Sequence, residues 1–203
     1  MEMQGERLIP ASVDSTWAAL NDPEVLKGCI AGCETLERTG EDSLSAVVAL
    51  KVGPVSARFK GKLQMTNVQA PHGYTINFDG QGGVAGFGKG SADVTLTAQG
   101  EQTVLKYTAR ATVGGKMAQI GSRLIDAAAA KITEDFFKAF EAHIQAHNEA
   151  HNEASTAPGA EAVVTDAGDI AVIANPAAAA GFGKLGWLLG AVVVVAVIYF
   201  VIR

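Results

Sequence analysis

The chain has 203 residues, of which 48% are hydrophobic and 18% charged, and its formal net charge is −5. This length allows one domain with an appendage or two small domains, and a charged fraction below the roughly 25% of average soluble chains excludes extended disorder. The net acidic charge argues against a general nucleic-acid-binding protein, which needs a basic surface. Two cysteines are too few for a disulfide scaffold or a cysteine-rich zinc module.

The N-terminal ten residues lack a basic segment followed by an apolar one, so we expect no signal peptide. An N-terminal strand should lead into two short helices. Ser12 is a typical helix N-cap ahead of Trp17 and Leu20, and Asp22-Pro23 places a proline at the first position of the second helix.

Cys29 and Cys33 follow at a spacing that places two side chains on one face of a helix. No histidine or further cysteine lies near them in the sequence. We therefore interpret them as partly buried thiols, and the sequence predicts no metal site.

Four segments alternate apolar and polar residues, as strands with one buried and one solvated face do. They are residues 55–66, 74–79, 91–98 and 105–113. The pattern predicts an antiparallel sheet. Arg58, Lys60 and Lys62 project from the polar face of the first of these strands, where they either keep the surface soluble or meet acidic lipids or a partner.

A glycine-rich segment, 80–90, separates two of the strands. From Gly83 it matches the first part of a phosphate-binding loop, but Gly90 replaces the residue that would bind magnesium and a strand follows where a helix is required. We predict no nucleotide site there. Val84 and Phe87 instead make the segment an apolar hairpin tip that gates a cavity or enters a membrane.

The last element of the domain is a helix predicted over residues 116–147, with apolar residues spaced by three and four positions. Laid across a curved antiparallel sheet, it gives an α+β domain. Inward positions mix small residues such as Ala57 and Ala109 with large ones such as Phe59 and Phe136. This mixture either brings the layers close together or leaves a dry cavity for an apolar ligand. Both interpretations stay open.

No catalytic residues are predicted. Ahead of the long helix, His72 is the only histidine, and it lies in a turn sequence between two strands. We find no paired carboxylates positioned for acid–base chemistry, no Gly-x-Ser-x-Gly motif and no Cys–His pair.

Residues 147–183 contain five acidic residues and no lysine or arginine. They predict an alanine-rich acidic tether between a domain at 1–146 and an anchor at 184–203, with a reach of about 30–35 Å. Within the tether, residues 162–175 are more apolar than a tether needs, and they form either a docking segment or a transient helix.

Residues 185–202 carry no charge and would span about 27 Å as a helix, flanked by Lys184 and Arg203. We predict a single transmembrane helix in the inner (cytoplasmic) membrane, with the domain on the cytoplasmic side. Gly186 and Gly190 form a G-x-x-x-G motif that would allow a weak homodimer.

Three segments together resemble the family of the carbon monoxide dehydrogenase G subunit: WAALNDPEVLKGCIAGCETLE at 17–37, KVGPVSARFKGKL at 51–63 and GGKMAQIGSRLIDAAAAKI at 114–132. They are spread over most of residues 1–146. Ala31 departs from the common C-I-P-G-C pattern of the family. The resemblance implies the START-like helix-grip fold of the SRPBCC superfamily, whose members enclose an apolar ligand cavity.

The resemblance implies an accessory protein and not an enzyme. It implies a role in recruiting carbon monoxide dehydrogenase of the molybdenum–flavin–iron–sulfur type, or a related oxidoreductase, to the membrane, and in binding menaquinone or another prenylated quinone. We expect membrane lipid as a further partner, and no covalent cofactor, metal or nucleic acid. The residues expected to line the cavity are Phe59, Leu63, Met65, Phe78, Tyr107, Leu124, Ile125, Ile132 and Phe136, with Val84 and Phe87 at its gate.

Two other interpretations stay open. The protein could be a purely structural membrane anchor for the dehydrogenase, with an incidental cavity. It could also be a START-like enzyme acting on a hydrophobic small molecule, with Tyr107 as the only evident inward polar group.

Overall fold

The computed structural model describes residues 2–155; the remainder of the predicted tether and the predicted anchor at 184–203 lie outside the described residues. None of the helices within this part of the chain is long and apolar enough to cross a lipid bilayer. In chain order the elements are β1 (Glu2–Ile9), α1 (Val13–Leu20), α2 (Pro23–Cys29), β2 (Cys33–Gly40), β3 (Ser43–Val52), β4 (Val55–Gln69), β5 (Gly73–Gln81), the 3-10 helix η1 (Gly83–Ala85), β6 (Phe87–Gln99), β7 (Gln102–Gly114), α3 (Lys116–Gln119) and α4 (Ser122–Ser155).

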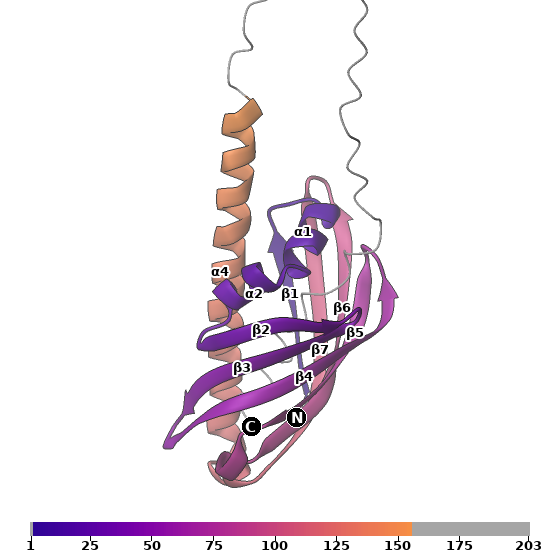
Figure 1. The fold of residues 1–203 in the computed structure, drawn as a ribbon. Coiled ribbons are helices and arrows are strands. Elements are labelled where there is room, and N and C mark those ends of the chain that lie inside the picture. The colour runs from indigo at the N-terminus through magenta and orange to yellow at the C-terminus, as the bar shows by residue number, and fades with distance from the viewer. Residues whose placement is uncertain (1, 156–203) are drawn as a thin grey trace, which may run out of the picture.

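The strands form one seven-stranded antiparallel sheet in the order β1-β7-β6-β5-β4-β3-β2. Strands β2 to β7 follow one another along the chain as neighbours, while β1 pairs with β7 at the far edge. The sheet curves around the long helix α4, which lies on its concave side (Figure 1). The predicted α+β class and the curved antiparallel sheet are confirmed.

All four alternating segments are strands, and their large apolar residues lie on the buried face. The register sets Leu63 of β4 opposite Phe78 of β5, and Val94 of β6 opposite Tyr107 of β7, so inward apolar side chains pair across neighbouring strands. Ala98, which the pattern places on the same face, is exposed because it lies next to the β6–β7 turn.

The two short helices begin where their sequences predict. The Ser12 hydroxyl accepts a hydrogen bond from the Ser15 backbone N–H at 3.2 Å, and the Asp22 carboxylate accepts one from the Glu24 N–H at 2.8 Å. Pro23 takes the first helical position, where its missing N–H leaves no bond unmade. Helix α2 then packs against β2 and α4.

The prediction that Cys29 and Cys33 share a helix face is wrong. Helix α2 ends at Cys29, and Gly32, with a φ of 78°, turns the chain into β2, which starts at Cys33. Burial raises the pKa of the Cys29 thiol to about 11, so this group stays protonated at neutral pH and is a poor metal ligand.

The single helix predicted over 116–147 is divided in two. Helix α3 ends at Gln119, and α4 begins at Ser122. Between them Gly121 has a φ of 92°, which a right-handed helix does not allow, so the chain changes direction there. At its other end α4 continues to Ser155, into the first part of the predicted tether.

A buried stripe holds α4 against the concave face of the sheet. Phe136, Phe137, Phe140 and Ile144 all belong to the core, and the rings of Phe136 and Phe140 stack with centroids 5.6 Å apart. Burying a large apolar side chain contributes about 1.5–3 kcal/mol. The stripe therefore supplies much of the free energy that joins the two layers.

We predict that Phe140→Ala lowers the free energy of unfolding by about 3–5 kcal/mol, because it leaves a cavity at a position with 0% exposure. Val84→Ala is the control: Val84 is 85% exposed, and truncating its side chain should lower the free energy by less than about 1 kcal/mol. Urea denaturation of the full-length chain in mild detergent, followed by circular dichroism, measures both. Equal losses would contradict the role given to Phe140.

Candidate apolar ligand-binding site

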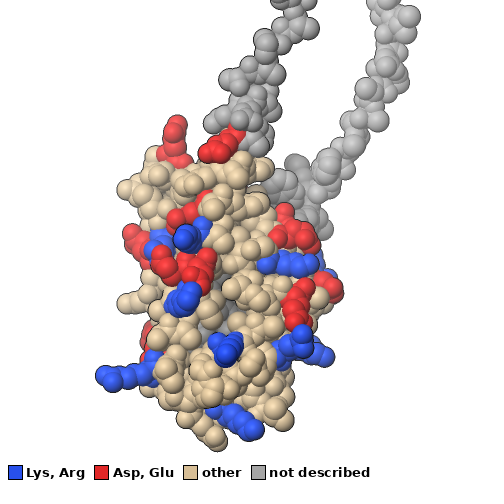
Figure 2. Space-filling view, turned by 90° about the vertical axis from the view of Figure 1, so that its left-hand side faces the viewer, with Lys and Arg blue, Asp and Glu red and all other residues tan. Residues whose placement is uncertain are grey.

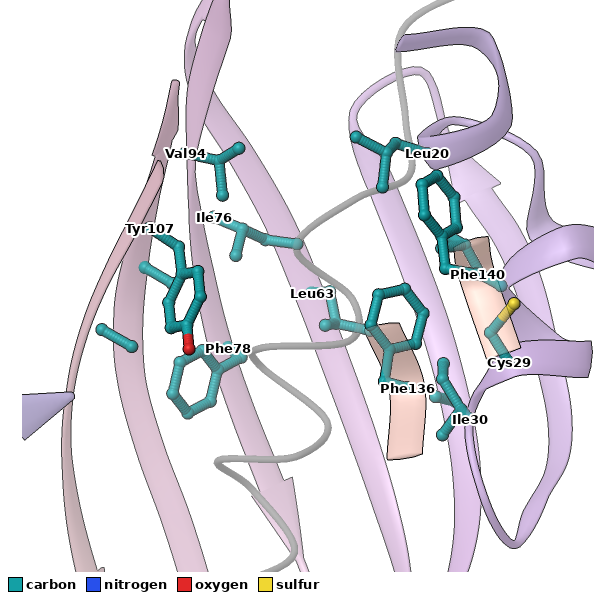
Figure 3. Close-up of a cluster of buried hydrophobic side chains, with 14 of the residues drawn as sticks. Leu20, Cys29, Ile30, Leu63, Ile76, Phe78, Val94, Tyr107, Phe136 and Phe140 are labelled. Atoms are coloured by element: carbon teal, nitrogen blue, oxygen red, sulfur yellow. The ribbon is translucent and has the colours of Figure 1, made fainter. Parts of the chain in front are cut away.

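Most of the predicted lining residues lie in the interior between α4 and the sheet. Strands β4, β5 and β7 supply five of them, and α4 supplies two from the opposite side. Figure 3 shows side chains from the sheet and from α4 pointing into this one interior. The buried members of the predicted set are Phe59, Leu63, Met65, Phe78, Tyr107, Ile125 and Phe136.

The other four predicted residues are less enclosed. Ile132 is partly buried against the core, whereas Leu124 is 53% exposed. Leu124 was expected in the lining, but the buried stripe of α4 passes through its neighbour Ile125 and leaves Leu124 outside. Val84 and Phe87, the expected gate, are both exposed, Val84 by 85%.

The guanidinium group of Arg7 joins the β1 edge of the sheet to α4. Arg7 of β1 forms an ion pair with Glu134 of α4, and its guanidinium lies 5.3 Å from the centroid of the Phe137 ring. That ring stacks on Tyr107, with centroids 5.7 Å apart. Burial raises the pKa of Tyr107, with Arg7 lowering it and Glu134 raising it further. The hydroxyl is therefore protonated at neutral pH and can donate a hydrogen bond.

Apart from the phenols Tyr74 and Tyr107, the buried polar side chains within residues 2–149 are Thr16, Asn21, Thr103 and Thr133, and none of these carries a carboxylate, imidazole, amine or guanidinium. The Thr133 hydroxyl, 3% exposed on α4, has no hydrogen-bond partner among the described residues. Such an unsatisfied group costs about 1–3 kcal/mol. The interior is therefore suited to hydrogen bonding with a ligand oxygen and poorly suited to acid–base chemistry.

A groove of about 660 Å³ opens where α4 begins, beside the first residues of β1 and the last of β7. Its volume falls within the range of ligand pockets, about 300–1,000 Å³. Ile125 belongs both to the wall of this groove and to the buried core, so the groove and the aromatic interior meet at this residue. The lining residues are Glu2, Met3, Val113, Ala118, Ser122, Ile125, Asp126 and Ala130.

Sequence reasoning missed Met3, Ala118 and Ala130 as groove residues. Strand β1 reads EMQGERLI and has no clear alternation, and an alanine on a helix carries little information about its surroundings. Val113 gave the one usable signal, because it is the last inward residue of an alternating segment and marks the strand end beside the groove.

Glycines let two loops pack together at the same end of the molecule. A Cβ on Gly86 would lie 2.0 Å from the backbone oxygen of Gly114, and a Cβ on Gly114 would lie 2.4 Å from the Phe87 ring. The η1 segment is therefore held against the β7–α3 connection with Val84 facing outward. Strand β6 follows at once, so the helix that a phosphate-binding loop requires is absent from this position.

Residues 5–145 match a family model that describes the G subunit of carbon monoxide dehydrogenase (CoxG). No curated protein matches the chain. Among solved structures, a conserved protein from Geobacillus kaustophilus is 33% identical with a TM-score of 0.67, and the match covers 71% of this chain and 95% of that one.

Two more distant structures show the fold alone. The Zhui aromatase/cyclase from Streptomyces sp. R1128 is 12% identical with a TM-score of 0.52, over 71% of this chain and 93% of its own. Ara h 8.0201 is 13% identical with a TM-score of 0.52, over 72% of this chain and 98% of its own. Both similarities match the helix-grip arrangement of one long helix on a curved antiparallel sheet.

The family match includes the aromatic interior, the apolar tip and most of the groove, and it extends over more than half of the chain. The chain therefore belongs to the family of the carbon monoxide dehydrogenase G subunit, CoxG.

Proposed function

We propose that the protein is a membrane-tethered accessory protein that binds a prenylated quinone, such as menaquinone, and couples carbon monoxide dehydrogenase to the respiratory chain. The observation that carries the proposal is the aromatic interior between α4 and the sheet, which meets a groove of mainly apolar lining at Ile125. The family name supports a molybdenum–flavin–iron–sulfur carbon monoxide dehydrogenase, or a related oxidoreductase, as the partner.

The chemistry of a prenylated quinone fits this interior. Each CH₂ group withdrawn from water is worth about 0.8 kcal/mol, so an isoprenoid tail needs an apolar enclosure outside the bilayer. Transfer from lipid to protein moves the tail between two apolar surroundings, so the free energies of the tail in the two places are nearly balanced. That balance allows both loading and release, as a carrier requires. The buried rings of Phe59 and Phe136 belong to this interior and are of the aromatic type that a quinone ring would contact.

Two hydroxyls in the interior are able to donate to quinone carbonyl oxygens. Tyr107 is protonated at neutral pH, and the Thr133 hydroxyl has no partner among the described residues. A ligand carbonyl that accepted from Thr133 would remove the penalty of an unsatisfied buried group. The ligand is thus oriented by hydrogen bonds while apolar contacts provide most of its affinity.

The membrane tether is inferred from sequence. The uncharged run 185–202 has the length of a bilayer span, and the acidic residues of the preceding segment disfavour contact with anionic headgroups. We infer that the domain stays on the cytoplasmic side, near both the quinone pool and the dehydrogenase, where tethering raises its effective concentration.

A catalytic role is not part of the proposal. The buried polar groups of the described chain include neither a carboxylate nor an imidazole, and general acid–base catalysis relies on such groups. The Zhui relative carries the name aromatase/cyclase, but at 12% identity it supports only the fold for this chain.

Ala130→Trp should abolish co-purification of the quinone, because the indole ring would fill the groove beside Ile125. Native mass spectrometry of the full-length protein, extracted from its host membrane, measures the bound mass. Ala142→Trp is the matched control: it is the same change at an exposed alanine of α4, about 18 Å further along the helix. If wild type carries no prenylated quinone, or both variants retain it, the ligand proposal fails.

Thr133→Val should separate ligand binding from stability. Removing an unsatisfied hydroxyl in favour of a methyl group should leave the thermal midpoint of the ligand-free protein unchanged or raise it. Titration with a short-chain menaquinone should give an affinity about tenfold weaker, since a hydrogen bond to the ligand is lost. Unchanged affinity would show that Thr133 does not contact the quinone.

The shuttle and the purely structural anchor predict different electron transfer. In vesicles that contain menaquinone, dehydrogenase and full-length protein, we expect CO-dependent quinone reduction with wild type and with Ala142→Trp, and its loss with Ala130→Trp. Sedimentation with the vesicles checks that the dehydrogenase is recruited equally in all three. Retained reduction with Ala130→Trp would favour the anchor.

A further inference from the structure

One end of the domain is rich in basic residues. Three segments form this end, because alternate turns of an antiparallel sheet lie on the same side: 50–60, 82–90 and 114–125. None of the three contains Asp or Glu. All of their basic residues are exposed, namely Lys51, Arg58, Lys60, Lys89, Lys116 and Arg123; we call this surface the basic end.

The opposite end has the reverse composition. It is formed by segments 10–24, 40–42, 70–72 and 99–102, which contain no Lys or Arg. Its acidic residues are Asp14, Asp22, Glu24, Glu41, Asp42 and Glu101. Figure 2 shows Lys and Arg at the lower end of the visible face, while Asp and Glu gather toward the upper part. The charge of the domain is therefore separated along its long axis.

Most charges of the basic end are available to a partner. Arg58 is paired with Glu34, but within the described residues no ion pair involves Lys51, Lys89 or Lys116. Three carboxylates adjoin this end, namely Glu2, Asp79 and Asp126, and two of them, Glu2 and Asp126, line the groove. Glu2 is paired with Arg110 at 3.1 Å, and Asp79 on β5 is flanked in register by two lysines, Lys62 and Lys89.

The exposed apolar side chains lie at the same end. Within the described residues four large hydrophobic side chains are exposed, and three of them belong to the basic end: Val84, Phe87 and Leu124. The fourth, Leu8, is 47% exposed and lies near the other end of β1. Leu124 lies beside the β3–β4 turn, where a Cβ on Gly53 would come 3.9 Å from its Cδ1 atom.

We propose that the basic end docks on an anionic phospholipid surface, with Val84, Phe87 and Leu124 entering the headgroup layer and the surrounding lysines and Arg123 contacting lipid phosphates. Basic residues near an anionic bilayer contribute about 1 kcal/mol each, and apolar side chains between them add insertion energy. In this orientation the groove beside Ile125 opens toward the bilayer.

A lipid surface fits these observations better than a protein partner. Protein interfaces are usually depleted of lysine at their centre, whereas a lysine-rich rim around protruding apolar side chains is typical of membrane-surface contacts. The acidic end would be repelled from the same bilayer, so charge alone sets one orientation.

The chain outside the structure is long enough for this orientation. Helix α4 carries the chain about 50 Å away from the basic end, at roughly 1.5 Å per residue. About 29 residues then separate Ser155 from the apolar run at Leu185. Fully extended, they would reach about 100 Å, and as a random coil about 30 Å. A segment of this length is therefore long enough to cover the return distance.

Co-sedimentation with vesicles tests the proposal on residues 1–155, which lack the predicted anchor. The described residues contain both layers of the fold, and the Geobacillus kaustophilus protein, 95% of which is covered, crystallises as this domain alone. We expect binding to vesicles of equal parts phosphatidylcholine and phosphatidylglycerol, and much weaker binding to phosphatidylcholine alone. The vesicles contain no quinone, so this result does not depend on the proposed ligand.

Matched variants locate the contact. Lys89→Gln with Lys116→Gln should weaken binding to the anionic vesicles on the order of 30-fold, about fivefold for each charge. Lys106→Gln with Lys131→Gln has the same net charge but removes exposed lysines elsewhere, paired with Glu6 and Asp135, and should change binding by less than about threefold.

A second pair of variants tests the apolar contribution to vesicle binding. Val84→Ser should weaken binding about fivefold, whereas Leu8→Ser, a similar change at the exposed residue outside the basic end, should not. Equal binding to both vesicle types, or equal losses in target and control variants, would overturn the proposal. If the wild-type protein does not bind vesicles, and Lys89→Gln with Lys116→Gln no longer retains the dehydrogenase, the basic end contacts a protein partner instead.

Discussion

The contact between the aromatic stripe of α4 and the concave face of the sheet determines the other features of this domain. Phe136, Phe137 and Phe140 fix the rotation of the helix about its axis, because only one rotation buries all three rings. That rotation places Thr133 and Ile125 toward the sheet and leaves Leu124 outside. The buried core, the groove beside Ile125 and the exposed position of Leu124 thus all follow from the rotation of α4 about its axis.

A second constraint acts at the end where α4 begins. Gly86 and Gly114 allow two loops to approach more closely than any side chain would permit, and Gly121 turns the chain from α3 into α4. These contacts hold the apolar tip of η1 beside the start of the helix. The same end is rich in basic residues, so the groove, the exposed apolar side chains and the positive charge occur together.

Alternation and helix-cap signals predicted much of the fold from sequence. The strands β4 to β7, the cap at Ser12 and the amphipathic helix follow from local patterns that do not depend on distant contacts. The break at Gly121 and the separation of Cys29 from Cys33 escaped prediction, because a glycine in a helical pattern is compatible with either continuation or a turn. Strands β2 and β3 were not delimited, since their residues alternate less regularly than those of β4. The groove was missed because it depends on how separate elements meet.

The central claim is that the interior between α4 and the sheet holds an apolar ligand which enters beside Ile125. A crystal structure of the full-length protein, purified from its native membrane without added ligand, tests this most directly. The account predicts density for a ring between Phe59 and Phe136, with a carbonyl oxygen within hydrogen-bonding distance of Thr133 Oγ1 and an isoprenoid tail leaving through the groove. An interior filled by its own side chains, with Thr133 bonded to protein, would contradict it.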